Sequence, residues 1–200
     1  MARLTRTESQ ARTRDQLIST AQTLFLRDGY FATSLERVAE EAGYSKGAVY
    51  SNFRNKDELC LAVIDTIREQ QAAKISAALL SATDFEQRLA AFEDWAETAI
   101  GDQGWSTLEM EFGSQVRRDP ALLKEFADRG NAIRSLVANL VTIGAAELGT
   151  ELPLPAERIA AALVSLGVGL GLQRAIDPTV SVSVLTDTIR LFAGASVPIR

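Results

Sequence analysis

Residues 33–64 read TSLERVAEEAGYSKGAVYSNFRNKDELCLAVI, and this stretch decides the fold of the N-terminal part of the chain. Thr33 and Glu36 have the spacing of a capping box, in which the threonine side chain caps a helix and the glutamate reaches back. The pattern therefore predicts a short helix over residues 35–42 with Thr33 as its N-cap. Gly43 ends that helix, because glycine accepts the backbone conformation that a tight turn requires.

A second short helix is predicted directly after this turn. Ser45 is its N-cap candidate, and the helix covers residues 46–53. Val49 and Phe53 lie four residues apart, so they share one face and pack inward. Two short helices joined by a tight turn containing glycine form a helix-turn-helix, whose second helix lies in the major groove of DNA.

The opposite face of the second helix has side chains suited to DNA. Gly47 and Ala48 are small and allow a close approach of the backbone, while Lys46 can reach a guanine edge or a phosphate. Residues 50–52 are Tyr, Ser and Asn, and all three form hydrogen bonds. The candidate DNA-binding residues are Thr33, Ser34, Ser45, Lys46, Gly47, Ala48, Tyr50, Ser51, Asn52 and Lys56.

Several of these candidates could contact phosphate groups of DNA, and several could have a purely structural role. Thr33 and Ser34 lie where the first helix begins, and free N–H groups there attract a phosphate. Lys56 precedes the next helix and is a further phosphate-binding candidate. A purely structural role, in which Thr33, Ser45 and Tyr50 cap and pack, stays open.

The remainder of the chain also has helical periodicity, and no window alternates as a strand. We therefore predict an all-α protein of about nine helices. A three-helix helix-turn-helix domain covers residues 1–56, helix 57–80 links the domains, and a larger helical domain extends over residues 57–200. The expected helices cover residues 14–27, 35–42, 46–53, 57–80, 84–100, 104–118, 121–148, 155–174 and 180–195.

Composition narrows the class of protein. The formal net charge is −5, but residues 1–60 carry +1 and the remainder −6, which is the asymmetry expected if the N-terminal part faces a polyanion. The chain has no histidine, so a His-ligated zinc site and a His general base are excluded. The single cysteine fits a reducing cytoplasm. The sequence has no uncharged apolar run of about 18 residues, so no membrane span is predicted. We expect no metal and no cofactor.

The stretch resembles the N-terminal domain of the TetR family of bacterial transcriptional regulators. The resemblance begins with F-x-x-x-G-Y at Phe25–Tyr30 and continues through TSLERVAEEAGYSKGAVYSNF to the KDEL that begins at Lys56. It implies a DNA-binding head and a C-terminal domain that dimerises and holds an effector pocket. It also implies that the equivalents of Thr33, Ser34, Lys46, Tyr50 and Lys56 meet the DNA backbone, and that Ala48, Ser51 and Asn52 vary with the operator.

The last two expected helices are candidates for the dimer interface. Helix 155–174 is apolar around most of its circumference and therefore must be buried on more than one side, with helix 180–195 as its neighbour. A core within one chain is the alternative. The candidate interface residues are Ile159, Leu163, Leu166, Gly167, Leu170, Gly171, Leu185, Ile189 and Phe192.

An effector pocket is expected between residues 92 and 112, where two helices have aromatic residues at helical spacing. Phe92 and Trp95 could equally be core residues, and a glutamate in this region could select a cationic or polar ligand. The candidate lining residues are Phe92, Trp95, Ile100, Trp105, Leu108, Glu109 and Phe112.

Together these features predict a cytoplasmic DNA-binding transcriptional regulator. We expect a repressor that binds a palindromic double-stranded DNA operator as a homodimer and is released by a small-molecule effector. A helical dimeric interaction protein and a ligand-independent regulator are the alternatives, and an enzyme is not expected because no catalytic motif is found. The effector, the operator and the choice between repression and activation are not defined by the sequence.

Overall fold

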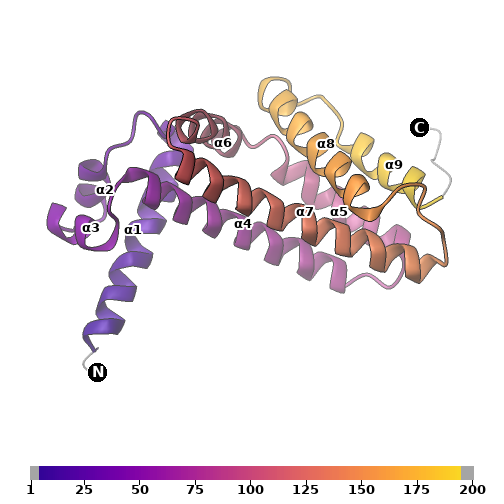
Figure 1. Ribbon diagram of the computed structural model, residues 1–200, viewed down its shortest axis with the longest axis horizontal. Helices are drawn as coiled ribbons and strands as arrows, with labels where there is room; N and C mark the ends of the chain where they lie inside the picture. Colours follow the sequence, from indigo (N-terminus) through magenta and orange to yellow (C-terminus); the bar gives the residue numbers. More distant parts are fainter. Residues whose placement is uncertain (1–4, 195–200) are drawn as a thin grey trace. The chain divides into compact units, whose positions relative to one another are not determined.

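The computed structural model describes residues 5–194, and all regular secondary structure within that range is helical (Figure 1). This confirms the predicted all-α class. The helices are α1 (Arg6–Asp28), α2 (Leu35–Glu41), α3 (Lys46–Asn52), α4 (Lys56–Leu80), α5 (Phe85–Ala99), α6 (Gln103–Val116), α7 (Pro120–Leu148), α8 (Ala156–Ile176) and α9 (Ser183–Phe192).

The chain forms two compact units whose boundary differs from the predicted division at residues 56/57. Unit 1 comprises Met1–Gln70 and Gln103–Val116, and unit 2 comprises Gln71–Asp102 and Arg117–Arg200. The difference has a physical cause, since the first part of α4 and the whole of α6 are packed with α1–α3.

Unit 1 has an apolar core to which α6 contributes buried side chains. Phe112 of α6 is fully buried, and its ring lies 5.5 Å from that of Tyr30. The N-terminal end of α6 approaches α1 so closely that a Cβ atom on Gly104 would lie 2.3 Å from the carbonyl oxygen of Leu26. Glycine is therefore required there. The buried residues of this core include Leu17, Leu24, Phe25, Val38, Val49, Phe53, Leu59, Val63, Ile64, Leu108, Phe112 and Val116.

Unit 2 is built on the packing of α8 against α7 and α9, with α5 against α9. Its hydrophobic core cluster consists of Ile159, Leu163, Leu170 and Leu185, with Phe92, Ile100, Leu166, Ile189 and Phe192 among the partly buried residues packed on it. The guanidinium of Arg174 is buried beside this core. It donates hydrogen bonds to the carbonyl oxygens of Ile100 and Val180 and to the carboxylate of Glu97.

The largest difference from the predicted helix bounds lies at the start of the first helix. The first helix begins at Arg6 rather than Arg14, because Thr5 and Glu8 form a capping box that the polar sequence before Arg14 concealed. The last helix ends at Phe192, whereas the predicted end at residue 195 lies outside the described residues.

Candidate nucleic-acid interface

The helix-turn-helix forms at the predicted position, in unit 1. After α2, the N–H of Tyr44 bonds to the carbonyl oxygen of Ala39 at 2.9 Å, and the N–H of Gly43 bonds to that of Glu40 at 3.1 Å. This pair of bonds is a Schellman motif, and Gly43 has the positive φ of 73° that the motif requires. The turn therefore fixes the direction in which α3 leaves α2.

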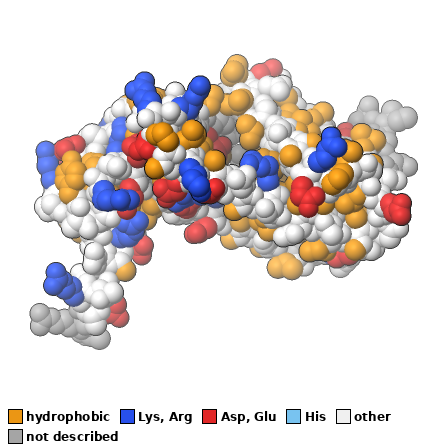
Figure 2. Space-filling model, in the orientation of Figure 1, with side chains coloured by type: hydrophobic (Ala, Val, Ile, Leu, Met, Phe, Trp, Pro, Cys, Tyr) orange, Lys and Arg blue, Asp and Glu red, His pale blue; other side chains and the backbone are white. Residues whose placement is uncertain are grey.

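The back of α3 is buried and its front is exposed, as predicted. Val49 and Phe53 are 0% and 1% exposed, whereas Lys46, Gly47 and Tyr50 lie on the exposed side. Ser45 is the N-cap, since its hydroxyl oxygen accepts a hydrogen bond from the N–H of Ala48 at 3.2 Å. Figure 2 shows Lys and Arg side chains over the region of α1 to α3, with acidic side chains among them.

Ser51 and Asn52 form hydrogen bonds within α3. The Ser51 hydroxyl and the Asn52 amide both donate to the carbonyl oxygen of Ala48, at 2.9 and 2.8 Å. Both bonds lie within one helix, between residues three and four apart, and contact of these side chains with a base stays a prediction.

Thr33 does not have the predicted role. Its side chain is 1% exposed, and its hydroxyl donates to the carbonyl oxygen of Gly29 at 2.9 Å. Ser34 is the N-cap of α2, because its hydroxyl oxygen accepts from the N–H of Arg37. The sequence prediction placed the cap one residue too early, and the buried Thr33 hydroxyl is not available to a phosphate in this structure.

Lys56 also differs from the prediction. Its ammonium group donates to the carbonyl oxygens of Tyr30 at 2.9 Å and Thr33 at 3.0 Å, and it lies 4.1 Å from the centre of the Tyr30 ring. Burial lowers the pKa of this ammonium group below its ordinary value. The side chain is therefore directed into unit 1, where it holds the turn between α1 and α2, and not toward a phosphate.

Tyr50 is 53% exposed and has an acidic neighbour that the sequence prediction missed. Its hydroxyl donates to the carboxylate of Glu36, on α2, at 3.3 Å. A hydrogen bond from the backbone, the charge of Lys46 and the Tyr50 hydroxyl hold the pKa of Glu36 below its ordinary value. A carboxylate therefore lies within the surface that is expected to face DNA.

Arg14 is a second residue that the sequence prediction missed. From α1, its guanidinium donates to the carbonyl oxygen of Asn52 at 2.6 Å and lies 4.0 Å from the centre of the Phe53 ring. It thus satisfies a free carbonyl group at the C-terminal end of α3, where a cation is favoured. Only the long-range packing of α1 on α3 reveals this role.

The candidate dimer residues are mostly core residues of unit 2. Ile159, Leu163, Leu170 and Leu185 are at most 9% exposed and form its core cluster, on which Leu166, Ile189 and Phe192 pack. The four buried side chains cannot face a second chain, so for them the prediction is wrong and the alternative of a core within one chain holds. Gly167 and Gly171 are half-buried, and their place in an interface stays a prediction.

The candidate pocket residues are divided between the two units. Phe92, Trp95 and Ile100 belong to unit 2, where the Trp95 indole N–H donates to Gln71 at 3.1 Å. Leu108 and Phe112 belong to unit 1 and are fully buried in its core.

Glu109 and Trp105 belong to unit 1 as well. The Glu109 carboxylate accepts from the Arg68 guanidinium at 3.1 Å, and burial raises its pKa although Arg68 opposes that shift. The assignment of these seven residues to an effector pocket stays a prediction.

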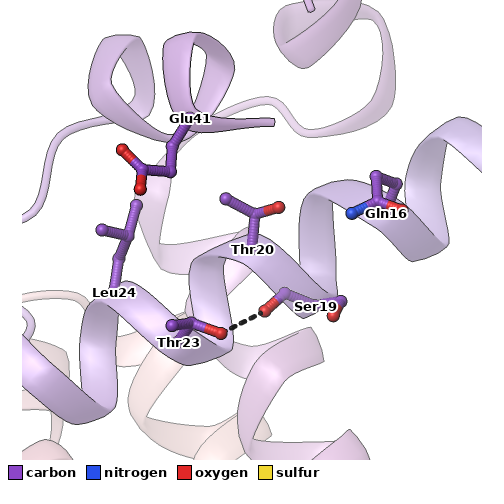
Figure 3. Close-up of a pocket in the computed structure, with 6 residues that line it drawn as sticks. All are labelled: Gln16, Ser19, Thr20, Thr23, Leu24 and Glu41. Carbon is purple, nitrogen blue, oxygen red and sulfur yellow. Dashed lines mark hydrogen bonds between the residues drawn. The ribbon is translucent and has the colours of Figure 1, made fainter. Parts of the chain in front are cut away.

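A shallow polar depression lies between α1 and α2 (Figure 3). It is lined by Gln16, Ser19, Thr20, Thr23, Leu24 and Glu41, and the Thr23 hydroxyl donates to the backbone of Ser19. Glu41 is the charged side chain among these six, so the lining offers no convergent set of charges for a ligand. Within residues 5–194, no group of His, Cys, Asp and Glu is arranged to hold a metal ion.

Among the described residues, α8 is long and apolar enough to cross a membrane by length and composition. Of the 18 residues in its most apolar stretch, 22% are buried within the chain. A core or interface helix of a globular protein passes the same test, so this finding alone does not indicate a membrane protein.

Comparison with known proteins identifies the helix-turn-helix. Residues 17–63 match the family described as "Bacterial regulatory proteins, tetR family". The chain is 42% identical over 69 residues to the HTH-type transcriptional regulator TtgR of Pseudomonas putida, covering 34% of this chain and 32% of TtgR. It is 37% identical over 78 residues to the HTH-type transcriptional activator FasR of Mycolicibacterium smegmatis, covering 39% and 36% of the two chains.

These alignments span about a third of the relatives' length, whereas a structural likeness extends further. A TetR-family transcriptional regulator from Agrobacterium tumefaciens matches with a TM-score of 0.64 and 18% identity over 92% of this chain and 95% of that one. At this identity the likeness concerns the fold alone. The helix-turn-helix that residues 17–63 form is therefore that of the tetR family of bacterial regulatory proteins.

Proposed function

We propose that the protein is a transcriptional regulator that binds double-stranded DNA through α3. The observation that carries this proposal is the two-sided character of α3. Val49 and Phe53 anchor its back in the core of unit 1, while Lys46, Gly47 and Tyr50 are exposed on its front. A helix that is rigidly supported on one side and small and polar on the other is suited to the major groove.

We further propose that the protein acts as a homodimer on a palindromic operator. Two recognition helices must reach major-groove sites about 34–36 Å apart, so a two-fold axis in the protein mirrors that of the operator. The surface that we assign to the dimer replaces the buried residues predicted from the sequence. It consists of the exposed apolar side chains of unit 2 on α8 and α9: Val168, Leu172, Ile176, Val184 and Leu191.

This surface has the regularity expected of a helix interface. Val168, Leu172 and Ile176 succeed one another at intervals of four, so they form one stripe along α8. Gly167 and Gly169 leave open space beside the stripe, because a Cβ atom on either would meet nothing within 4 Å. A second helix can approach closely at such a position.

As the mode of regulation we propose repression relieved by a small molecule, in the cytoplasm. A dimer on DNA blocks other proteins from the same site, and a ligand releases it if the ligand binds the conformation that does not fit DNA more tightly. FasR is named an activator, so the sign of regulation needs its own test. A reporter placed behind the selected operator should lose expression when the protein is supplied.

The central test is selection of DNA from a randomised duplex library by the purified protein. Enrichment of a palindrome and its protection in footprinting are expected, and enrichment of no sequence contradicts the proposal. Lys46→Ala should weaken binding to the selected site about tenfold, because one phosphate or guanine contact is lost. The salt slope, which is the slope of the logarithm of the binding constant against the logarithm of the salt concentration, should fall in magnitude by about 1. Lys74→Ala removes an exposed lysine of α4 and is the matched control.

A further inference from the structure

The turn that leads from α1 into the helix-turn-helix is held by a side chain that comes from α6. The Glu111 carboxylate accepts hydrogen bonds from the backbone N–H groups of Tyr30 at 2.6 Å and Phe31 at 3.3 Å. Glu111 belongs to unit 1 and lies outside residues 17–63, the segment that matches the family. It is half-buried, so these bonds are shielded in part from water.

The other side of the same turn is held from α4. The Lys56 ammonium group donates to the carbonyl oxygens of Tyr30 and Thr33, and the Tyr30 hydroxyl donates to Asp57. The N–H groups of the turn thus meet a carboxylate, while its carbonyl groups meet an ammonium ion. Hydrogen bonds with a charged partner are stronger than neutral ones, so the backbone of the turn is fixed from both sides.

Gly29 makes room for this arrangement. It has a φ of 86°, which favours glycine, and a Cβ atom there would lie 2.8 Å from a carboxylate oxygen of Glu111. The carbonyl oxygen of the same glycine accepts from the Thr33 hydroxyl. The position of Glu111 is therefore linked through the turn to the residue that directly precedes the N-cap of α2.

We propose that Glu111 is a positioning residue for DNA binding. Its carboxylate holds the turn at residues 29–33 in the conformation that sets the start of α2, and α2 and the Schellman turn in their turn set the direction of α3. Operator affinity therefore depends on an acidic side chain of α6 whose own bonds are to the backbone of the turn. This proposal rests on the proposed function.

The sign of the effect separates positioning from simple electrostatics. Glu111→Gln removes a negative charge, and fewer negative charges on a DNA-binding protein ordinarily strengthen its binding. A positioning role requires the opposite, because the neutral amide makes weaker bonds to the two N–H groups. We expect operator affinity to fall about tenfold, with a salt slope that stays within about 1 of the wild-type value because no phosphate contact is removed.

The experiment compares Glu111→Gln with Glu69→Gln on the full chain. Both changes remove one carboxylate from unit 1, but Glu69 is an exposed residue of α4. Operator affinity, its dependence on salt concentration and hydrogen exchange of peptides covering residues 29–34 are measured for each. Weaker binding and faster exchange in Glu111→Gln, with less than about a threefold change in binding for Glu69→Gln, are expected.

Each other outcome has a defined meaning. A Glu111→Gln variant that binds the operator as tightly as the wild type, or more tightly, overturns the positioning role while the proposed function stands. Equal losses in the two variants also overturn it. If the wild type selects no DNA, the proposed function fails and this proposal fails with it. Should Glu111→Gln not fold, Glu111→Asp keeps the charge but shortens its reach, and the same comparison of affinity and exchange decides.

Discussion

The guanidinium of Arg14 donates a hydrogen bond to the carbonyl oxygen of Asn52 at 2.6 Å, and so joins α1 to the C-terminal end of α3. The same group lies over the Phe53 ring. Replacing Arg14 with Met removes both interactions and leaves the carbonyl group without this partner. We expect the free energy of unfolding in urea to fall by about 1–2 kcal/mol.

Operator binding by Arg14→Met should weaken as well, because the C-terminal end of α3 is no longer fixed. Arg12→Met changes an exposed arginine of the same helix and is the control. Equal effects of the two changes on stability would show that loss of positive charge, and not the bond to Asn52, is responsible.

Glu36 should limit binding to unrelated DNA. Its carboxylate accepts from Tyr50 and lies near the charge of Lys46, so a phosphate at this surface meets a like charge and must displace an existing bond. In Glu36→Gln we expect affinity for a random duplex to rise about three- to tenfold, with a smaller rise for the selected operator. Competition binding against both duplexes measures this loss of preference, and an unchanged ratio of affinities would contradict it.

The exposed stripe on α8 should determine the oligomeric state. Val168→Asp combined with Leu172→Asp places two charges on side chains that are 55% and 36% exposed, so the isolated chain tolerates them. We expect the dissociation constant of the dimer to rise at least about 100-fold, since a buried unpaired charge is costly. Analytical ultracentrifugation measures it. Leu140→Asp, at an exposed position of α7, should leave the dimer intact.

Glu109 should make stability depend on pH in a defined direction. Because burial raises its pKa in the folded protein, its contribution to stability is fully present below the ordinary carboxyl pKa. That contribution is lost as the pH rises through the raised value. The difference in unfolding free energy between the wild type and Glu109→Gln should therefore shift against the wild type as the pH rises above the ordinary carboxyl pKa of about 4. Urea titrations across this range test it, and a constant difference would contradict it.

The sequence predicted the features that depend on near neighbours in the chain. Ser45 as a cap and the inward packing of Val49 and Phe53 follow from spacings of three or four residues, and all are confirmed. The sequence pattern predicts Thr33 as the N-cap in place of Ser34, because both residue types cap helices. Only the hydrogen bond of the Thr33 hydroxyl to Gly29 distinguishes them. A capping pattern therefore locates a helix start only to within about one residue.

Features that depend on distant parts of the chain could not be predicted. Lys56 turns inward because it donates to two carbonyl groups that lie more than twenty residues earlier in the sequence. Ile159 and Leu185 have the pattern of buried residues, but the pattern is the same for a core within one chain and for an interface between chains. Arg14, Glu36 and Glu111 carry their roles through neighbours that no spacing rule identifies.

The burial of Phe112 and Leu108 in the core of unit 1 has a consequence for exchanging parts between regulators. The unit that contains the helix-turn-helix is discontinuous along the chain. Residues 71–102 belong to unit 2, and α6, at residues 103–116, completes unit 1. A chimaera that contains only the first seventy residues would expose to solvent the apolar side chains that α6 covers in this protein. To transfer its DNA specificity to another protein, α6 must therefore be transferred together with the N-terminal helices on which it packs.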